Sequence, residues 1–166
     1  MTKQLPQRSE LDSALTWNLA GLFASNAEWE AAFSGIQTDI AAFSSLAGSL
    51  CESPAALLRV LEQDGAISLT LERLYVYAHM KRDEDNAVSL YQGMTDRALQ
   101  QSVAFGAASS FLAPEILAIP PETLQNWIED PVLLPYKRVL KNLARRRPHT
   151  LTANEERLLA LAGEPL

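Results

Sequence analysis

A chain of 166 residues is long enough for one domain with a sizeable core, and its 48 % hydrophobic content argues against wholesale disorder. The formal net charge of −6 argues against a general nucleic-acid or anionic-membrane binder, because both need a positive surface. Cys51 is the single cysteine, so neither an internal disulfide nor a thiolate zinc site is expected. Residues 1–12 lack the apolar core of a signal peptide, and we expect a cytoplasmic protein.

Residues 1–25 show no sustained hydrophobic period and are predicted to form an extended arm with a short turn at 18–21. The first strong helix follows, and Ser25 or Asn26 can cap its free N–H groups. Apolar residues then recur at alternating spacings of four and three, which is one face of an α-helix, and a stop is predicted at Gly48. These residues are Trp29, Phe33, Ile36, Ile40 and Phe43.

Ser53 and Pro54 open a second predicted helix, because serine caps and proline tolerates the first helical position. From Leu69 to Ala78 the apolar residues spread around the helix, which is typical of a helix buried between neighbours. Glycine is costly in a helix interior, so Gly65 marks a candidate break.

Asp85 or Asn86 can cap a third helix that runs to about Leu112. Its segment 104–110 consists mostly of small residues, which lets two helix backbones approach closely, so a short-range helix crossing is predicted there. The alternating pattern of a strand is absent throughout the sequence.

Shorter elements follow toward the C-terminus. A helical turn is predicted at 115–118, a short helix from Pro121, and a further helix from Pro131 or Leu134 to Arg146. The spacing of Thr152 and Glu155 is that of a capping box, which predicts a last helix ending at Gly163.

The predicted fold is therefore all-α, an irregular helical bundle of four or more helices preceded by the extended arm. Residues 26–166 are expected to form a single helical domain. Seven side chains are predicted to be buried in it: Trp29, Phe33, Ile36, Leu71, Leu74, Tyr75 and Phe105.

The candidates for chemistry are few. His79 and His149 lie seventy residues apart, and neither belongs to a His-Glu-x-x-His pair or has a glutamate three residues earlier. Cys51 has no partner histidine in the sequence around it, and the acidic run 83–85 lacks the spacing of a calcium loop. We therefore expect no catalytic, cofactor-binding or metal-binding residue in this chain.

Positive charge concentrates in one segment, where we expect docking against an acidic surface of another domain rather than nucleic-acid binding, because aromatic residues for base stacking are lacking apart from Tyr136. The cations are Lys137, Arg138, Lys141, Arg145, Arg146 and Arg147.

Three stretches, taken in order, resemble the oligoendopeptidase F family of zinc metallopeptidases, a thimet-oligopeptidase-like group of the M3 class. The first is Thr-Trp-Asn-Leu-Ala-Gly-Leu-Phe at 16–23, with Asn18 where the family typically has aspartate. The second is Leu-Tyr-Val-Tyr-Ala at 74–78, followed by the acids at 83–85. The third is Arg-Pro-His-Thr-Leu-Thr at 147–152, followed by Glu155 and Glu156.

The resemblance covers nearly the whole chain and implies the N-terminal, non-catalytic part of a longer peptidase. Family members place their His-Glu-x-x-His helix and a further glutamate ligand in a catalytic half that this sequence does not contain. The implied cofactor is therefore zinc in the parent enzyme and none in this segment. The implied role is part of the wall of a substrate cavity that admits only short peptides.

The implied partners are the C-terminal catalytic domain of the same chain and oligopeptide substrates, with no nucleic acid and no membrane. Because the helix over 69–78 is apolar on most sides, the isolated domain is also expected to self-associate. The alternative interpretation is a free-standing helical protein-interaction module without enzymatic activity.

Overall fold

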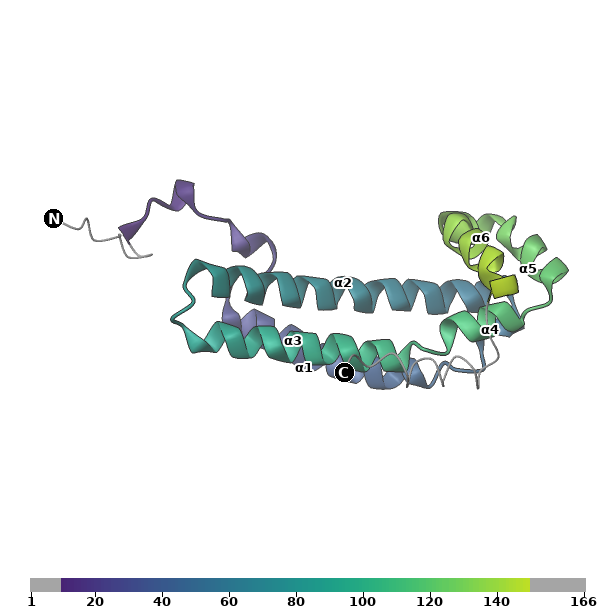
Figure 1. Ribbon diagram of the computed structural model, residues 1–166, viewed down its shortest axis with the longest axis horizontal. Helices are drawn as coiled ribbons and strands as arrows, with labels where there is room; N and C mark the ends of the chain where they lie inside the picture. Colours follow the sequence, from purple (N-terminus) through teal and green to yellow (C-terminus); the bar gives the residue numbers. More distant parts are fainter. Residues whose placement is uncertain (1–9, 150–166) are drawn as a thin grey trace. The chain divides into compact units, whose positions relative to one another are not determined.

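The structure, a computed structural model, describes residues 10–149, and all regular elements in that range are helical, which confirms the all-α prediction (Figure 1). The α-helices are α1 (Asn26–Ser44), α2 (Pro54–Glu84), α3 (Ser89–Ala108), α4 (Leu112–Ala118), α5 (Pro121–Ile128) and α6 (Lys137–Arg146). The 3₁₀ turns are η2 (Ser13–Leu15), η3 (Leu19–Gly21), η4 (Leu50–Glu52), η5 (Pro131–Tyr136) and η6 (Arg147–His149). The turn predicted at 18–21 is η3.

The chain divides into two compact units, one of residues 1–47 and 60–110 and one of residues 48–59 and 111–166. The helix α2 contributes to both, since its residues 54–59 count with the second unit. The organisation predicted from the sequence, an arm over 1–25 and a single helical domain over 26–166, stays a prediction. Within 10–149 no single helix is long and apolar enough to cross a membrane, although the bent pair 89–118 with 121–128 passes by length and composition alone.

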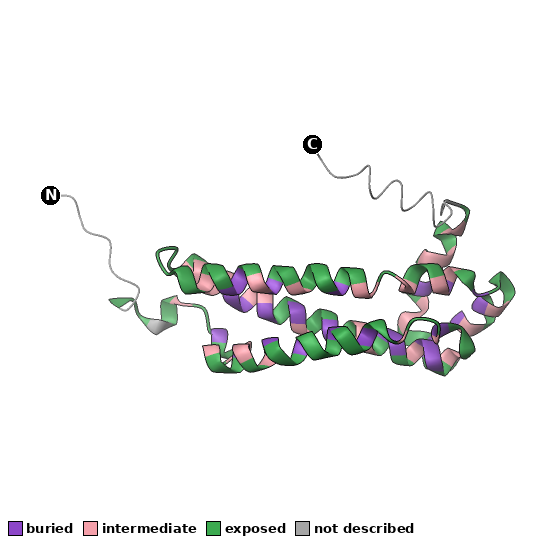
Figure 2. Cartoon of the chain, turned by 90° about the horizontal axis from the view of Figure 1, so that it is seen from below, coloured by how far each residue is buried: buried purple, intermediate pink, exposed green. Residues whose placement is uncertain are grey.

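The core of the first unit is built around Trp29, which is fully buried in α1. Its indole Nε1 donates a hydrogen bond to the carbonyl oxygen of Leu74 in α2 at 2.9 Å, and its ring stacks on Phe33 with centroids 5.1 Å apart. Farther along, Phe43 of α1 meets Phe105 of α3 edge-on at 5.3 Å. Along the long helices, buried positions alternate with exposed ones, as expected for amphipathic helices (Figure 2).

Six of the seven side chains predicted to be buried are buried, and the exception is Tyr75, which is half-buried. The prediction for Tyr75 was wrong because the apolar residues of α2 exceed what its neighbours in the first unit cover. Leu69, on the same helix, remains 58 % exposed.

The helix starts were predicted well where a serine precedes them. Ser25 Oγ accepts the Glu28 N–H at 3.2 Å, and the Glu28 carboxylate accepts the Ala24 N–H at 2.8 Å. Ser53 Oγ accepts the Ala56 N–H at 3.1 Å at the start of α2. Such side-chain caps satisfy backbone donors that have no partner within the first turn.

Three boundary predictions are corrected. Helix α2 runs through Gly65 without a break, since tertiary packing outweighs the small cost of one glycine. Helix α3 begins after Val88, and Asp85 instead accepts the Ala87 N–H at 2.9 Å within the turn. The same helix ends at Ala108, where the Ser109 hydroxyl bonds back to the Gly106 carbonyl instead of continuing the helix toward residue 112.

The close helix crossing predicted at 104–110 is absent from the described part of the chain. Ala104, Gly106 and Ala107 are exposed, and a Cβ added at Gly106 would meet nothing within 4 Å. The small residues therefore lie on an uncovered stretch of α3.

The second unit has its own core, in which α5 and η5 pack on α6 and α4 packs on η4. Glu115 of α4 accepts the N–H of Gly48, whose φ of +88° requires glycine, at 2.7 Å. The helix predicted from Pro131 or Leu134 divides into η5 and α6, since Pro135 cannot donate a helical hydrogen bond. The buried apolar residues of this unit are Leu50, Ala56, Leu57, Ile116, Ile119, Leu124, Ile128, Leu133 and Leu140. The helix predicted over 152–163 lies outside the described residues.

We expect the α1–α3 contact of the first unit to depend on a bidentate ion pair. Arg97 of α3 donates to both carboxylate oxygens of Glu30 at 2.7 Å and lies 4.2 Å from the ring centroid of Phe33. Lysine in place of Arg97 cannot make both hydrogen bonds to the Glu30 carboxylate or stack its head group on Phe33. The free energy of unfolding should therefore fall by about 0.5–1 kcal/mol in urea titrations. An unchanged midpoint would contradict this role.

The pH dependence of this contact has a defined sign. The hydrogen bond and charge of Arg97 hold the pKa of the Glu30 carboxyl below its ordinary value of 4.5. Its stabilisation is therefore present above that ordinary value and is lost as the pH falls through the lowered pKa. The unfolding free-energy difference between the wild type and Glu30→Gln should shrink in acid, as measured by urea titrations from neutral pH downward.

Candidate functional site

The first two stretches that carry the family resemblance meet at a pocket in the first unit. Residues 16–24 form one wall of this pocket, and the C-terminal part of α2 forms the other. The volume is about 430 Å³, within the range of small-ligand pockets. The lining residues are Thr16, Trp17, Asn18, Leu19, Ala20, Phe23, Ala24, Tyr77, Lys81 and Glu84.

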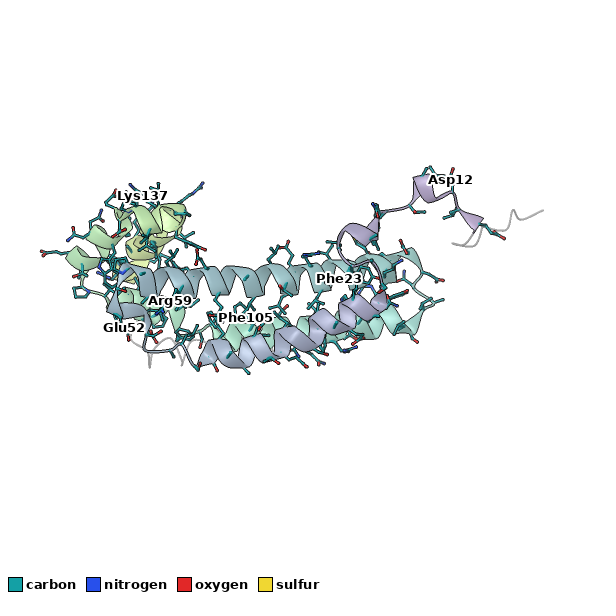
Figure 3. All side chains as sticks on the ribbon, turned by 180° about the vertical axis from the view of Figure 1, so that it is seen from behind. Asp12, Phe23, Glu52, Arg59, Phe105 and Lys137 are labelled. Atoms are coloured by element: carbon teal, nitrogen blue, oxygen red, sulfur yellow. The ribbon has the colours of Figure 1, made fainter. Side chains whose placement is uncertain are left out.

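Aromatic and polar contacts fix the N-terminal segment against α2, where Phe23 lies beside the helix (Figure 3). The rings of Phe23 and Tyr77 meet edge-on with centroids 5.5 Å apart, and the Tyr77 hydroxyl donates to Asn26 Oδ1 at 2.9 Å. Arg73 donates to the Leu22 carbonyl oxygen at 2.6 Å. Burial raises the pKa of the Tyr77 hydroxyl, so it keeps the proton it donates.

The chemistry of this pocket is that of non-covalent binding. Trp17 is 58 % exposed and offers an aromatic face, while Lys81 and Glu84 form an ion pair at 3.2 Å. The other lining side chains are apolar or uncharged polar groups, apart from these two charges. Within residues 10–149 no three histidine, cysteine or acidic side chains gather closely enough to hold a metal ion.

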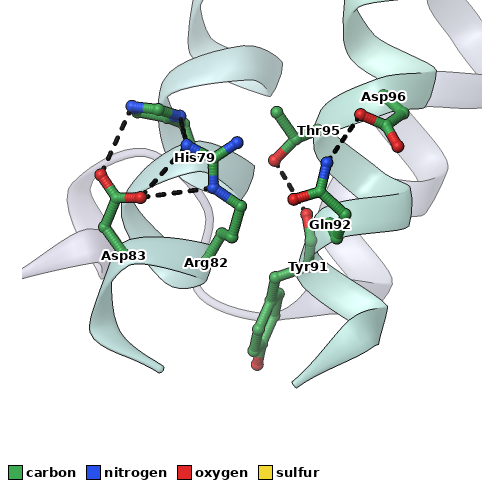
Figure 4. A network of polar contacts seen from close by, with 7 residues as sticks. All are labelled: His79, Arg82, Asp83, Tyr91, Gln92, Thr95 and Asp96. Atoms are coloured by element: carbon green, nitrogen blue, oxygen red, sulfur yellow. Dashed lines mark hydrogen bonds and ion pairs between the residues drawn. The ribbon is translucent and has the colours of Figure 1, made fainter. Parts of the chain in front are cut away.

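His79 is engaged in a polar network on α2 (Figure 4). Its Nδ1 lies 2.6 Å from an Arg82 nitrogen, and its Nε2 lies 3.4 Å from Asp83. Because a guanidinium can only donate, Nδ1 must accept, which leaves the ring proton on Nε2 facing the carboxylate. Both ring nitrogens are therefore used within the helix. His149 lies in η6, in the other unit, so the two histidines are described separately.

The acidic run at 83–85 is engaged at the end of α2. Asp83 contacts His79 and Arg82, and Glu84 pairs with Lys81. Asp85 accepts a backbone N–H in the following turn. Each of the three carboxylates therefore contacts a different set of partners at the end of α2.

Cys51 of η4 is an exposed free thiol whose surroundings favour the protonated form. Its sulfur lies 3.5 Å from the Glu115 carbonyl oxygen. Partial burial of the sulfur, and secondly the Glu115 carboxylate, raise the pKa of the Cys51 thiol. A raised pKa disfavours the thiolate, which is the nucleophilic form.

The predicted cations lie on α6 and η6 of the second unit. Lys137 and Lys141 both pair with Glu129, which follows α5. Arg147 donates to the Ile119 carbonyl oxygen at 2.8 Å. Arg138 and Arg145 are exposed.

A shallow groove between α2 and α3 is the second candidate in the first unit, with a volume of about 330 Å³. Leu99, which lines it, is 46 % exposed, and Val103, one turn farther along α3, is 75 % exposed. The lining residues are Ser68, Leu71, Glu72, Tyr75, Leu99, Ser102 and Phe105. The sequence shows that apolar residues lie on most sides of α2. It does not show the groove, because the groove forms only where α3 packs beside α2.

Comparison with known proteins connects this architecture to one family. The model of the oligopeptidase F family matches residues 115–166. Oligopeptidase PepF of Bacillus subtilis is 37 % identical over 98 % of the chain, and the plasmid-encoded oligoendopeptidase F of Lactococcus lactis subsp. cremoris is 35 % identical over 95 %. The chain spans about a quarter of the length of these curated relatives.

A solved structure shows the same fold. A crystallised protein of Chlamydophila abortus superimposes over 98 % of this chain and 28 % of its own, with a TM-score of 0.80 and 24 % sequence identity. The resemblance read from the sequence is thereby confirmed: the chain corresponds to the N-terminal helical domain of an oligoendopeptidase F-type protein of the M3 class.

The pocket wall formed by residues 16–24 should depend on the Tyr77 hydroxyl. Tyr77→Phe removes a largely buried hydrogen bond and leaves the Asn26 amide unpaired, so the free energy of unfolding should fall by about 1 kcal/mol. Trp17 fluorescence quenching by acrylamide should also change, because the segment loses one attachment. The matched control is Tyr75→Phe on the same helix. Equal effects of both substitutions would contradict the assignment.

Proposed function

We propose that this chain is the non-catalytic N-terminal domain of a zinc-dependent oligoendopeptidase that hydrolyses short peptides. One observation carries the proposal. Nearly the whole chain matches about a quarter of the length of proteins that are named as oligopeptidases and oligoendopeptidases. The catalytic residues then lie in the remaining part of the parent chain.

The donor set of the described residues does not fit a catalytic zinc. Such a site needs three protein ligands and an open position, whereas His79 is engaged by Arg82 and Asp83, and Cys51 favours the protonated thiol. We infer that the zinc and its ligands belong to the remaining part of the parent. The contribution of this domain to the parent enzyme is then structural, through the surface that it presents to the catalytic part.

The surface features of the first unit support a role as part of a cavity wall. The groove between α2 and α3 and the uncovered small-residue stretch of α3 leave apolar area exposed. Exposed apolar patches of a few hundred Å² are typical of interaction sites. We infer that the catalytic part of the same chain covers this groove and that the domain restricts access to short peptides.

The division of labour has a direct test. The chain alone should retain no stoichiometric zinc after dialysis and should not cleave a quenched fluorogenic peptide. The same chain joined to its remaining catalytic part should cleave short peptides, but not folded proteins, in a chelator-sensitive manner. Zinc retention together with chelator-sensitive cleavage by the chain alone would refute the proposal.

The uncovered groove should make the isolated chain self-associate. Covering the exposed apolar side chains at this groove would remove apolar area from water, which contributes roughly 25 cal/mol per Å² to association. Leu99→Glu, which places a charge in the groove, should weaken association at least about tenfold in a sedimentation concentration series.

The control is Leu90→Glu, also on α3 and 53 % exposed. Nine residues are about two and a half helical turns, so Leu90 lies on the face opposite Leu99. This variant should associate like the wild type. A strictly monomeric wild type would contradict the docking groove and favour a free-standing interaction module.

A further inference from the structure

The charges of this chain are strongly segregated along the sequence. Residues 131–149 contain six lysines and arginines and no acidic residue, whereas the rest of the chain has all 20 acids and the other cations. Because the net charge of the whole chain is −6, the positive segment is a local feature, and its surface has to be judged on its own.

The positive segment forms one side of a groove in the second unit, between α5 and α6. Its volume is about 390 Å³. Buried Ile128 and half-buried Ala144 supply an aliphatic floor, and Lys141 and Arg145 supply a cationic rim. Gln125 completes the lining.

One carboxylate already binds beside this groove. Glu129 pairs with Lys137 and, at 3.1 Å, with Lys141. The hydrogen bonds from these two lysines lower the pKa of the Glu129 carboxyl. Arg145 lies one turn beyond Lys141, is exposed, and makes no hydrogen bond or ion pair with residues 10–149. The groove therefore presents one cation that an added carboxylate can bind.

We propose that the groove between α5 and α6 binds an acidic segment of a polypeptide. One carboxylate of that segment pairs with Arg145, and an adjacent aliphatic side chain covers Ile128 and Ala144. Glu129 competes for Lys141 and limits the affinity.

The lining favours a peptide over a nucleic acid. Single-stranded nucleic acids bind through aromatic stacking and through cations that follow the backbone. The floor here is aliphatic, and Arg145 is the rim cation that no residue of 10–149 pairs with. The inference does not depend on the proposed peptidase role, since it rests on this groove and its charges alone.

The experiment measures fluorescence anisotropy of a fluorescein-labelled peptide, Gly-Leu-Glu-Leu-Gly with an amidated C-terminus, titrated with the full chain. The same peptide with glutamine in place of glutamate should bind at least about tenfold more weakly, because a charge-assisted hydrogen bond is lost. Arg145→Glu should weaken binding by a similar factor. Glu129→Gln should strengthen it, because Lys141 becomes free.

Arg138→Glu is the matched charge control. It changes the net charge by the same amount on the same helix, but Arg138 does not line the groove, so the affinity should change less than about threefold at physiological salt. Circular dichroism of each variant checks that the fold is retained.

Three results would overturn the proposal. The first is equal binding of the glutamate and glutamine peptides. The second is tighter binding of labelled single-stranded DNA, weakened equally by Arg138→Glu and Arg145→Glu, which would indicate a nucleic-acid surface. The third is binding that appears only when Glu155 and Glu156 are both replaced by glutamine, which would make the chain's own acidic residues the occupant.

Discussion

The fully buried indole of Trp29 connects the long helices of the first unit. Its N–H satisfies a carbonyl oxygen of α2, one face stacks on Phe33, and Arg97 of α3 lies 5.1 Å from its ring centroid. Arg97 is in turn held by Glu30 of α1. A buried aromatic with a satisfied polar atom and a cation on its ring combines large area burial with directional contacts. The relative placement of α1, α2 and α3 depends on this cluster.

The contacts that Trp29 makes with α2 also position the pocket at the end of that helix. Leu74, which accepts the indole hydrogen bond, lies three residues before Tyr77, so fixing α2 there fixes the side chains that hold residues 16–24. The first two stretches of family resemblance are therefore joined by packing, which gives a structural reason for both motifs.

The two units offer different kinds of surface. In the first unit, the exposed Leu99 side chain lines a groove between α2 and α3. In the second unit, cations border an aliphatic floor between α5 and α6. Apolar burial is non-directional and suits a large permanent contact, whereas charge-assisted contacts add specificity and respond to salt. The two proposed partners follow this difference, with a permanent neighbour on the apolar groove and an acidic partner on the cationic one.

The sequence by itself determined the helical class, the capped starts at Ser25 and Ser53, and the family. These features are local, since a cap needs only the first helical turn and the apolar face of α1 follows from a 3.6-residue period. The family resemblance likewise depends on motifs that can be read without a fold.

Only the tertiary structure decided which apolar residues are covered. Leu69 and Leu74 lie on the same helix, yet one is exposed and the other fully buried, because burial depends on which neighbour packs on each face. The same reason explains the exposed small residues Ala104, Gly106 and Ala107 and the half-buried Tyr75. Likewise, residues 16–24 and α2 form one pocket, and Ile128 and Arg145 border one groove, although they are distant in the chain. Sequence periodicity identifies the face of a helix, but contact between faces is created only by folding.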